Sequence, residues 1–280
     1  MVGLSLERPR VASRKPTAGV SYYLRVLRVV GGIDFKTKYV DSALGYVWSV
    51  AKPLAMFAVL YTVFGRFFKL NTGFAHYPLY LLVGLVVWIF FVDATGVAMT
   101  SLVARGSLLR KLAFPHLVIP ISVTVSAAMT FLVNLVVVAV FVIVNHISPS
   151  LSWLWIPLLI TELFVFTLAV GLVLATAFVR LRDVTQLWEL ILQLLFFGTP
   201  IMYPVGFLPP WAKPIAFVDP VIQIMQDLRA LIVGGPQAVT AADVYHTAWG
   251  YAAPVGFCLL VLAFGLWIFQ RESPWFAERV

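Results

Sequence analysis

Long apolar runs constrain the fold of this chain more than any other feature. Roughly 20 apolar residues in a helix span the hydrocarbon core of a bilayer, and a helix satisfies its own backbone hydrogen bonds in lipid. The sequence therefore predicts an all-α integral membrane protein with six transmembrane helices, of which the fifth is the shortest. The six runs lie at about 46–65, 79–99, 117–144, 153–179, 185–203 and 249–270.

Composition supports this class and limits the chemistry. The 280 residues are 61% hydrophobic and 11% charged, whereas soluble domains average about 25% charged. The single cysteine, Cys258, excludes a disulfide framework and a cysteine-based metal site. Residues 1–20 lack the apolar core of a signal peptide. We expect 1–20 to be a loose cytoplasmic tail and 21–280 to be one polytopic domain.

The distribution of Lys and Arg predicts the orientation, because cytoplasmic loops carry an excess of these residues. With six spans, fifteen of the twenty cations fall on the side of the two termini and four on the other. Both termini are therefore expected in the cytoplasm. The cytoplasmic side holds Arg8, Arg10, Arg14, Lys15, Arg25, Arg28, Lys36, Lys38, Arg105, Arg110, Lys111, Arg180, Arg182, Arg271 and Arg279.

An amphipathic segment precedes the first apolar run. In residues 21–40, four apolar side chains at helical spacing form a stripe flanked by Arg25 and Arg28. Such helices lie in the plane of the lipid head groups. The sequence thus predicts an N-terminal interface helix, and its basic residues are suited to anionic membrane lipids. We expect no nucleic-acid partner, because no separate domain presents these cations.

Aromatic residues recur at helical spacing within the first span. Phe57, Tyr61, Phe64 and Phe68 are separated by four, three and four residues, so in an α-helix all four rings share one face. Two interpretations follow from the spacing alone. The rings face lipid or a neighbouring helix, or they line a passage through the membrane.

The segment between the fifth and sixth spans is too apolar for a free loop and too interrupted for a span. Asp219-Pro220 is typical of a helix N-cap followed by proline at the first helical position. Gly234-Gly235 predicts the end of that helix. We expect a re-entrant helical hairpin in the outer leaflet, at the mouth of a passage; a partly buried extracellular cap is the alternative.

Six polar residues within or beside the spans occur at matching depths on consecutive helices. Their depths predict three structural pairs, Lys52 with Asp93, Asn134 with Glu162, and Arg180 with Glu189. Polar groups inside a membrane also mark proton relays, which is the alternative interpretation.

The sequence lacks the motifs of an enzyme. It contains no GxxxxGK[ST] phosphate-binding loop, no HExxH motif and no pair of cysteines. We therefore expect no catalytic centre, no metal and no cofactor on this chain. Active transport would need energy from a partner or from an ion gradient.

Four segments, in order along the chain, resemble a known family. They are KTKYVDSALGYVWSVAKPL, LLRKLAFPHLVIP, VRLRDV and GTPIMYPVGFLPPW. With six spans and a basic amphipathic start, the chain resembles the transmembrane subunit of ABC exporters for lipid-linked cell-surface polysaccharides. These exporters include the O-antigen and teichoic-acid types, and the closest likeness is to exporters of cell-wall galactan.

The resemblance implies a homodimer with two copies of a separate ATPase subunit, which binds ATP and Mg²⁺. It also implies a bacterial plasma membrane location and a polyprenyl-pyrophosphate-linked glycan moved to the exterior. A small-molecule ABC exporter is a rival interpretation. An ion-coupled secondary transporter is another, although we see no convincing internal repeat of the kind such carriers contain.

The resemblance assigns roles to four groups of residues. Lys36, Lys38, Tyr39, Leu44 and Gly45 would receive the lipid pyrophosphate. Leu108, Leu109, Arg110, Lys111 and Phe114 would lie on a helix, Ser107–His116, that docks on the ATPase. Phe57, Tyr61, Phe64, Phe68, Trp88, Phe196 and Phe197 would line the glycan passage. Tyr203, Pro204, Pro209 and Trp211 would form an outer gate.

Overall fold

The computed structural model describes residues 45–69, 76–106, 115–235 and 238–279. Every regular element in these ranges is helical, as predicted. Five helices are long and apolar enough to cross a membrane. They coincide with the first, second, third, fourth and sixth predicted spans, and they cover Val47–Phe67, Tyr77–Ala104, Val118–Val144, Leu151–Arg180 and Trp249–Trp275.

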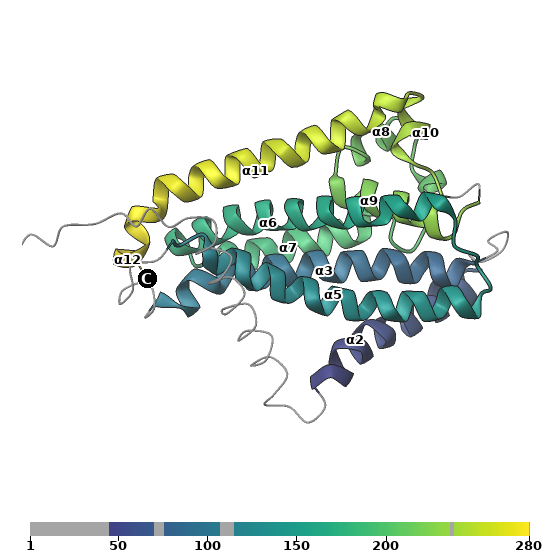
Figure 1. Cartoon of the computed structure of the whole chain (residues 1–280), viewed down its shortest axis with the longest axis horizontal. Coiled ribbons are helices and arrows are strands. Elements are labelled where there is room, and N and C mark those ends of the chain that lie inside the picture. Colours follow the sequence, from purple (N-terminus) through teal and green to yellow (C-terminus); the bar gives the residue numbers. More distant parts are fainter. Residues whose placement is uncertain (1–44, 70–75, 107–114, 236–237, 280) are drawn as a thin grey trace, which may run out of the picture.

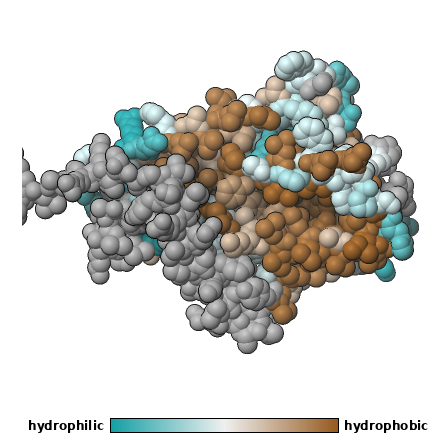
Figure 2. Space-filling model, viewed as in Figure 1, coloured by the Kyte–Doolittle hydropathy of each residue, from teal (hydrophilic) through white to brown (hydrophobic). Residues whose placement is uncertain are grey.

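Helix α3 (Tyr77–Ala104) is the centre of the bundle. Helices α5 (Val118–Val144) and α6 (Ile156–Arg180) pack along it, and α11 (Ala252–Glu272) packs on α6 (Figure 1). Because neighbours cover α3 on several sides, it is the most buried of the long helices. Figure 2 shows hydrophobic residues over the middle of the visible face and hydrophilic residues toward its two ends, as expected of a membrane protein.

The first span changes helix type along its length. Helix α2 (Gly45–Leu60) contains Pro53, and it continues without a break into a π-helix, η1 (Tyr61–Phe67). A π-helix has more residues per turn than an α-helix, so side-chain directions after Tyr61 depart from the 3.6-residue period. The first span lies at the edge of the bundle and contacts α3 and α5 (Figure 1).

The fifth predicted span is shorter than expected. Helix α7 (Val184–Gly198) has 15 residues and ends where the backbone becomes extended at Thr199, just before Pro200. At 1.5 Å per residue it is roughly 22 Å long, less than the ~30 Å hydrocarbon core. The structure thus shows five helices of spanning length and one shorter apolar helix among the described residues, and a sixth crossing at α7 stays a prediction.

Short helices form a cap at one end of the bundle, which we define as residues 199–251. It contains α8 (Ala212–Ala216), α9 (Pro220–Ile232) and α10 (Ala241–Tyr245), with the 3-10 turns η3 (Val205–Phe207) and η4 (Ala248–Tyr251) (Figure 1). The predicted start of α9 is confirmed, because the backbone N–H of Val221 donates to Asp219 Oδ1 at 2.9 Å. Its predicted end is confirmed by Gly234 and Gly235, with φ of 67° and 87°.

The opposite end of the bundle, which we call the C-terminal end, brings together four helix termini. There α3 and α6 end, α5 begins, and α11 leads into η5 (Ser273–Trp275) and α12 (Phe276–Arg279). A small apolar cluster holds these termini together. Its buried members are Leu102, Ile119, Leu172, Ala175, Val179, Phe269 and Phe276.

Candidate functional site

The four aromatic residues of the first span form two stacked pairs rather than one stripe. Phe57 stacks on Tyr61 with ring centroids 5.9 Å apart, and Phe64 stacks on Phe68 at 5.6 Å. The π-helix accounts for the split, because a spacing of three residues no longer superposes Tyr61 and Phe64. The expectation of a single α-helical face is therefore wrong beyond Tyr61.

The two pairs have different surroundings. Phe57 packs against Phe141 of α5, with centroids 5.4 Å apart, and Tyr61 lies 6.3 Å from Tyr77 of α3. Phe68 is exposed. The first pair thus packs within the chain. In the second pair Phe64 is partly buried against the same core, and Phe68 presents its ring surface.

The other predicted passage residues lie together between α3 and α7. Trp88 of α3 lies 6.0 Å from Phe196 of α7, and Phe196 contacts Phe197 at 5.4 Å. Trp88 is buried and Phe197 is exposed, so the group extends from the core to the surface. We call these three residues the α3–α7 aromatic group.

The predicted gate residues do not all lie in similar surroundings. The hydroxyl of Tyr203 donates to the carbonyls of Phe197 and Gly198, both at 3.1 Å, and so binds the last turn of α7. Pro204 is buried, while Pro209 and Trp211 are exposed on the cap. Tyr203 therefore positions the break after α7, and Trp211 lies on the surface.

The strongest polar feature of the cap is Arg229 on α9, one of the four cations that the sequence places on the exterior side. Its side chain is completely buried. The guanidinium donates to three backbone carbonyls, those of Tyr80 at 2.9 Å, Pro200 at 2.7 Å and Ile201 at 2.6 Å. It also lies 3.7 Å from the ring of Tyr80. We call this set the Arg229 clamp; it joins α9 to α3 and to the break after α7.

Gly84 makes room for the clamp. A Cβ atom at this position of α3 would lie 2.8 Å from Cζ of Arg229 and 3.1 Å from Sδ of Met225. The sequence did carry a signal for Arg229, because it follows Met225 by four residues and precedes Ile232 by three. It therefore lies on the apolar stripe of α9, where a cation needs a buried partner.

Two of the three predicted polar pairs are wrong. Asn134 donates to the carbonyl of Thr130 in its own helix at 3.1 Å, and it lines a small pocket with Asp93 of α3. Glu162 lines a different cavity, beside Asp227 of the cap. The rotation of α5 turns Asn134 toward α3 rather than α6, so matching depth did not identify its neighbour.

Arg180 also has a different partner from the one predicted. It forms a two-bond ion pair with Glu272 at the end of α11, with Nε to Oε2 at 3.0 Å and Nη2 to Oε1 at 2.5 Å. Glu189 is exposed on α7. Lys52 and Asp93 are both exposed, and their pairing stays a prediction.

The C-terminal end adds a polar contact beside the ion pair. His116, just before α5, shares a hydrogen bond of 2.7 Å with the hydroxyl of Ser273, and its ring lies 6.1 Å from that of Phe276. Burial lowers the pKa of His116. These contacts fix His116, two residues after segment 107–114.

Several predicted residues lie outside the described residues. They are the cytoplasmic tail, the interface helix, Lys36, Lys38, Tyr39 and Leu44, and the docking residues Leu108, Leu109, Arg110, Lys111 and Phe114. Gly45, from the same predicted pyrophosphate group, is the first residue of α2.

The fold and these contacts define a polytopic membrane protein whose helices are joined by a buried polar clamp. The chain belongs to the ABC-2 type transporter family, whose model matches residues 26–233. This confirms the family expected from the resemblance at the level of its transporter class.

Comparison with curated proteins identifies relatives of similar length. The chain is 31% identical to the O-antigen export system permease protein RfbA of Klebsiella pneumoniae, over 95% of this chain and 99% of that one. It is 27% identical to the protein of that name from Myxococcus xanthus, over 71% and 76%. It is 21% identical to the polysialic acid transport protein KpsM of Escherichia coli, over 72% and 79%.

Proposed function

We propose that this chain is the membrane-spanning subunit of an ATP-driven exporter that moves a polyprenyl-pyrophosphate-linked polysaccharide from the cytoplasm to the exterior. One observation carries the proposal: a relative aligned over 95% of this chain is named as an O-antigen export permease. Relatives named for O-antigen and for polysialic acid favour polysaccharide over a small molecule as the cargo class.

The aromatic groups support the proposal chemically. A neutral glycan needs flat apolar surfaces and few strong polar traps, since ring faces contact sugar C–H groups without fixing one hydroxyl pattern. Phe68 in the second stacked pair and Phe197 in the α3–α7 aromatic group both present exposed rings. We assign the passage to the second stacked pair and to the α3–α7 aromatic group, in which Trp88 and Phe196 lie on the buried side of Phe197.

The proposal also includes the assembly. Two copies of this chain would pair with two ATPase subunits, which hold ATP and Mg²⁺, so that this chain carries no cofactor and no catalytic residue. The exposed leucines of α7 offer an apolar surface for lipid or a second copy; they are Leu187, Leu190 and Leu194. Both termini would lie on the cytoplasmic side of a bacterial plasma membrane, and the cap would lie outside.

Copurification tests the proposal as a whole. The tagged chain is isolated from its native membrane in mild detergent with its candidate ATPase subunits, and ATP hydrolysis is measured with and without purified lipid-linked glycan. We expect a stable complex whose hydrolysis rate responds to the glycan. A complex that responds only to small apolar compounds would contradict the choice of cargo, and the absence of an ATPase partner would contradict the energy source.

A substitution in the proposed docking segment tests the coupling. Leu109→Asp should leave the complex able to hydrolyse ATP but reduce glycan export at least tenfold, because a buried carboxylate at an apolar contact weakens docking. The measurement is glycan export into inverted vesicles, normalised to hydrolysis. Leu151→Asp, at a residue that is 87% exposed, is the matched control. Normal export by Leu109→Asp would refute the docking role.

A further inference from the structure

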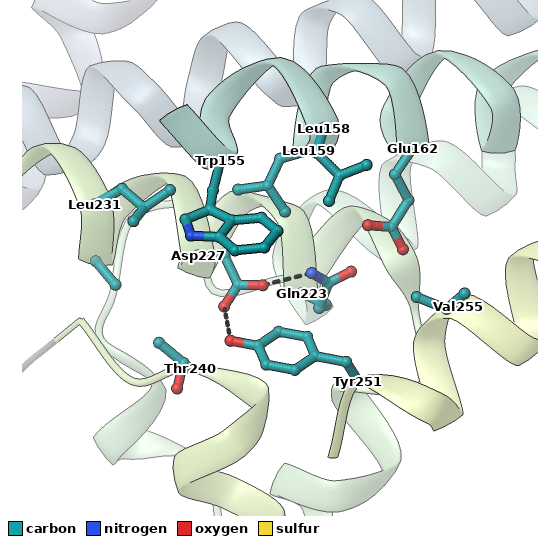
Figure 3. Close-up of a pocket in the computed structure, with 11 residues that line it drawn as sticks. Trp155, Leu158, Leu159, Glu162, Gln223, Asp227, Leu231, Thr240, Tyr251 and Val255 are labelled. Atoms are coloured by element: carbon teal, nitrogen blue, oxygen red, sulfur yellow. Dashed lines mark hydrogen bonds between the residues drawn. The ribbon is translucent and has the colours of Figure 1, made fainter. Parts of the chain in front are cut away.

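A cavity beneath the cap is separate from both aromatic groups. It lies where the start of α6, the middle of α9 and the start of α11 meet, and its volume is about 450 Å³, within the usual range for small-molecule sites. Figure 3 shows its walls. The lining residues are Trp155, Leu158, Leu159, Glu162, Gln223, Asp227, Ala230, Leu231, Thr240, Tyr251 and Val255.

One carboxylate of the cavity is already hydrogen-bonded. Asp227 is 4% exposed, and it accepts from the side-chain amide of Gln223 and from the hydroxyl of Tyr251, the latter at 3.5 Å. Figure 3 shows both hydrogen bonds meeting at the carboxylate of Asp227. Asp227 therefore holds Gln223 and Tyr251 in place rather than awaiting a ligand.

Two other oxygens of the cavity are unpaired. Oε1 of Gln223 and Oε1 of Glu162 are buried and have no hydrogen-bond partner in the described part of the chain. Gln223 is 0% exposed, and with its amide nitrogen bound to Asp227 its oxygen is directed to the side of Glu162 (Figure 3). A buried acceptor without a donor is costly, so the site is suited to a ligand that donates hydrogen bonds.

The rest of the wall is flat and apolar. The rings of Trp155 and Tyr251 lie on either side of the polar floor, and leucine and valine side chains complete the surface (Figure 3). The described lining includes no Lys and no Arg, so it offers no counter-charge for a phosphate or a sugar acid. The lining therefore disfavours an anion. Its carboxylates would also accept from a small amine, but the flat apolar wall favours an uncharged ligand that is rich in hydroxyl donors and flat on one face.

We propose that this cavity binds one neutral pyranose unit, with a C–H face on Trp155 and hydroxyl groups donating to Glu162 and Gln223. A single ring fits the volume and matches the two unpaired acceptors. The inference rests on the proposed function, since the sugar would be a unit of the exported polysaccharide. It adds a binding site on the cap side of the bundle that is distinct from the aromatic passage.

Binding to the intact complex tests the site. The complex is placed in nanodiscs, and the dissociation constants of methyl galactoside, methyl mannoside and methyl rhamnoside are measured by saturation-transfer NMR. We expect the wild type to bind at least one of them. Trp155→Leu should weaken that binding at least tenfold and Glu162→Gln about fivefold. Both residues border the cavity rather than the bundle core, and Trp155 is 62% exposed, so both variants should fold.

Matched controls lie elsewhere on the chain. Trp267→Leu removes an exposed tryptophan of α11, and Glu189→Gln neutralises an exposed carboxylate of α7; both should bind the glycoside as the wild type does. Absence of glycoside binding, equal binding by Trp155→Leu, or tighter binding of ethanolamine or methyl glucuronide would each overturn the sugar site.

The two proposals fail in different ways. If wild-type ATP hydrolysis responds to lipid-linked glycan but no glycoside binds at the cavity, the cavity inference alone is wrong. If hydrolysis does not respond to glycan, the proposed function is wrong, and glycoside binding that depends on Trp155 would then identify a sugar site without an assigned transport role.

Discussion

Different kinds of interaction hold the helices together at the two ends of the bundle. At the cap end, the Arg229 clamp makes three hydrogen bonds from a fully buried guanidinium to backbone carbonyls on two other segments. At the C-terminal end, an apolar cluster and the ion pair of Arg180 with Glu272 join the helices. The side chain of Arg180 is 53% exposed and that of Glu272 is 9% exposed, so water screens the arginine side of this pair.

This difference in interactions implies a difference in how freely the helices can move at each end. Hydrogen bonds to fixed carbonyls are directional and weaken steeply when their geometry is lost, whereas apolar contacts tolerate small shifts because they are non-directional. We infer that the cap end keeps one geometry around the break after α7. The C-terminal end can adjust, and it adjoins the segment proposed to contact the ATPase.

The largest effect is expected from removal of the clamp. Arg229→Met keeps the side-chain length but leaves buried carbonyls unpaired, and each costs about 1 to 3 kcal/mol. We expect a loss of about 3 to 5 kcal/mol, measured by thermal unfolding of the complex in detergent. Arg182→Met, at an exposed arginine, is the control. A loss below about 1 kcal/mol would mean that the cap end is not held by Arg229.

A glycine substitution should have a smaller but related effect. Gly84→Ala places a methyl group against the guanidinium, and we expect a loss of about 2 to 3 kcal/mol from overpacking. Because both changes act on one contact, Gly84→Ala with Arg229→Met should be little worse than Arg229→Met alone. Additive losses in this double-mutant cycle would separate Gly84 from the clamp.

The cap end should also respond to pH through Asp227. Burial raises its pKa from 3.8 to about 6, and Asp243 adds to the rise. The folded state therefore favours the protonated acid. Its contribution to stability is complete below about pH 4 and is lost as the pH rises through about 6.

The measurement is a comparison with Asp227→Asn between pH 4 and pH 7. The wild type should lose about 2 kcal/mol relative to the variant over this range. The comparison cancels groups that titrate equally in both proteins, including Asp219, whose pKa burial also raises to about 6. A parallel pH dependence of the two proteins would show that folding does not raise the pKa of Asp227.

The smallest effect is expected at the C-terminal end. Glu272→Gln breaks the ion pair with Arg180, but the arginine is exposed and can be solvated once its partner is neutral, so we expect a loss of only about 1 kcal/mol, near the upper limit for exposed pairs. Thermal unfolding should change little, and added salt should not enlarge the change. If Glu272→Gln were as damaging as Arg229→Met, the contrast between the two ends would be wrong.

The features that the sequence predicted well are those that depend on local composition. The apolar runs located five long helices, and Asp219-Pro220 with Gly234-Gly235 located α9 to within about two residues. Run length and capping chemistry are properties of consecutive residues, so no knowledge of neighbouring helices is needed.

The features that failed depend on rotation and on helix type. Matching depth along the membrane does not determine which side of α5 carries Asn134. It also does not reveal that Arg180 pairs with Glu272 of α11 rather than with Glu189 of α7. The aromatic spacing was correct for an α-helix, but the π-helix at Tyr61–Phe67 has no distinctive sequence pattern. Of the candidate site, Trp88, Phe196 and Phe197 are neighbours, and their role in lining a passage stays a prediction.

The cavity beneath the cap was not predicted. Its residues come from the 3-10 turn η2 (Leu151–Trp155), from α6, α9, η4 and α11, and from Thr240, so they are scattered over about a hundred positions of the sequence. Only the fold brings them together. Glu162 was noticed as a charge within a span, but its neighbour was assigned to the wrong helix.

The short length of α7 has a consequence for the lipid around it. A 15-residue helix is roughly 22 Å long, some 8 Å shorter than a typical hydrocarbon core. With α7 as the predicted sixth crossing, hydrophobic mismatch would draw the two leaflets closer together around it. In the proposed transport, local thinning of this kind would shorten the apolar distance that the charged pyrophosphate head group has to cross beside the α3–α7 aromatic group.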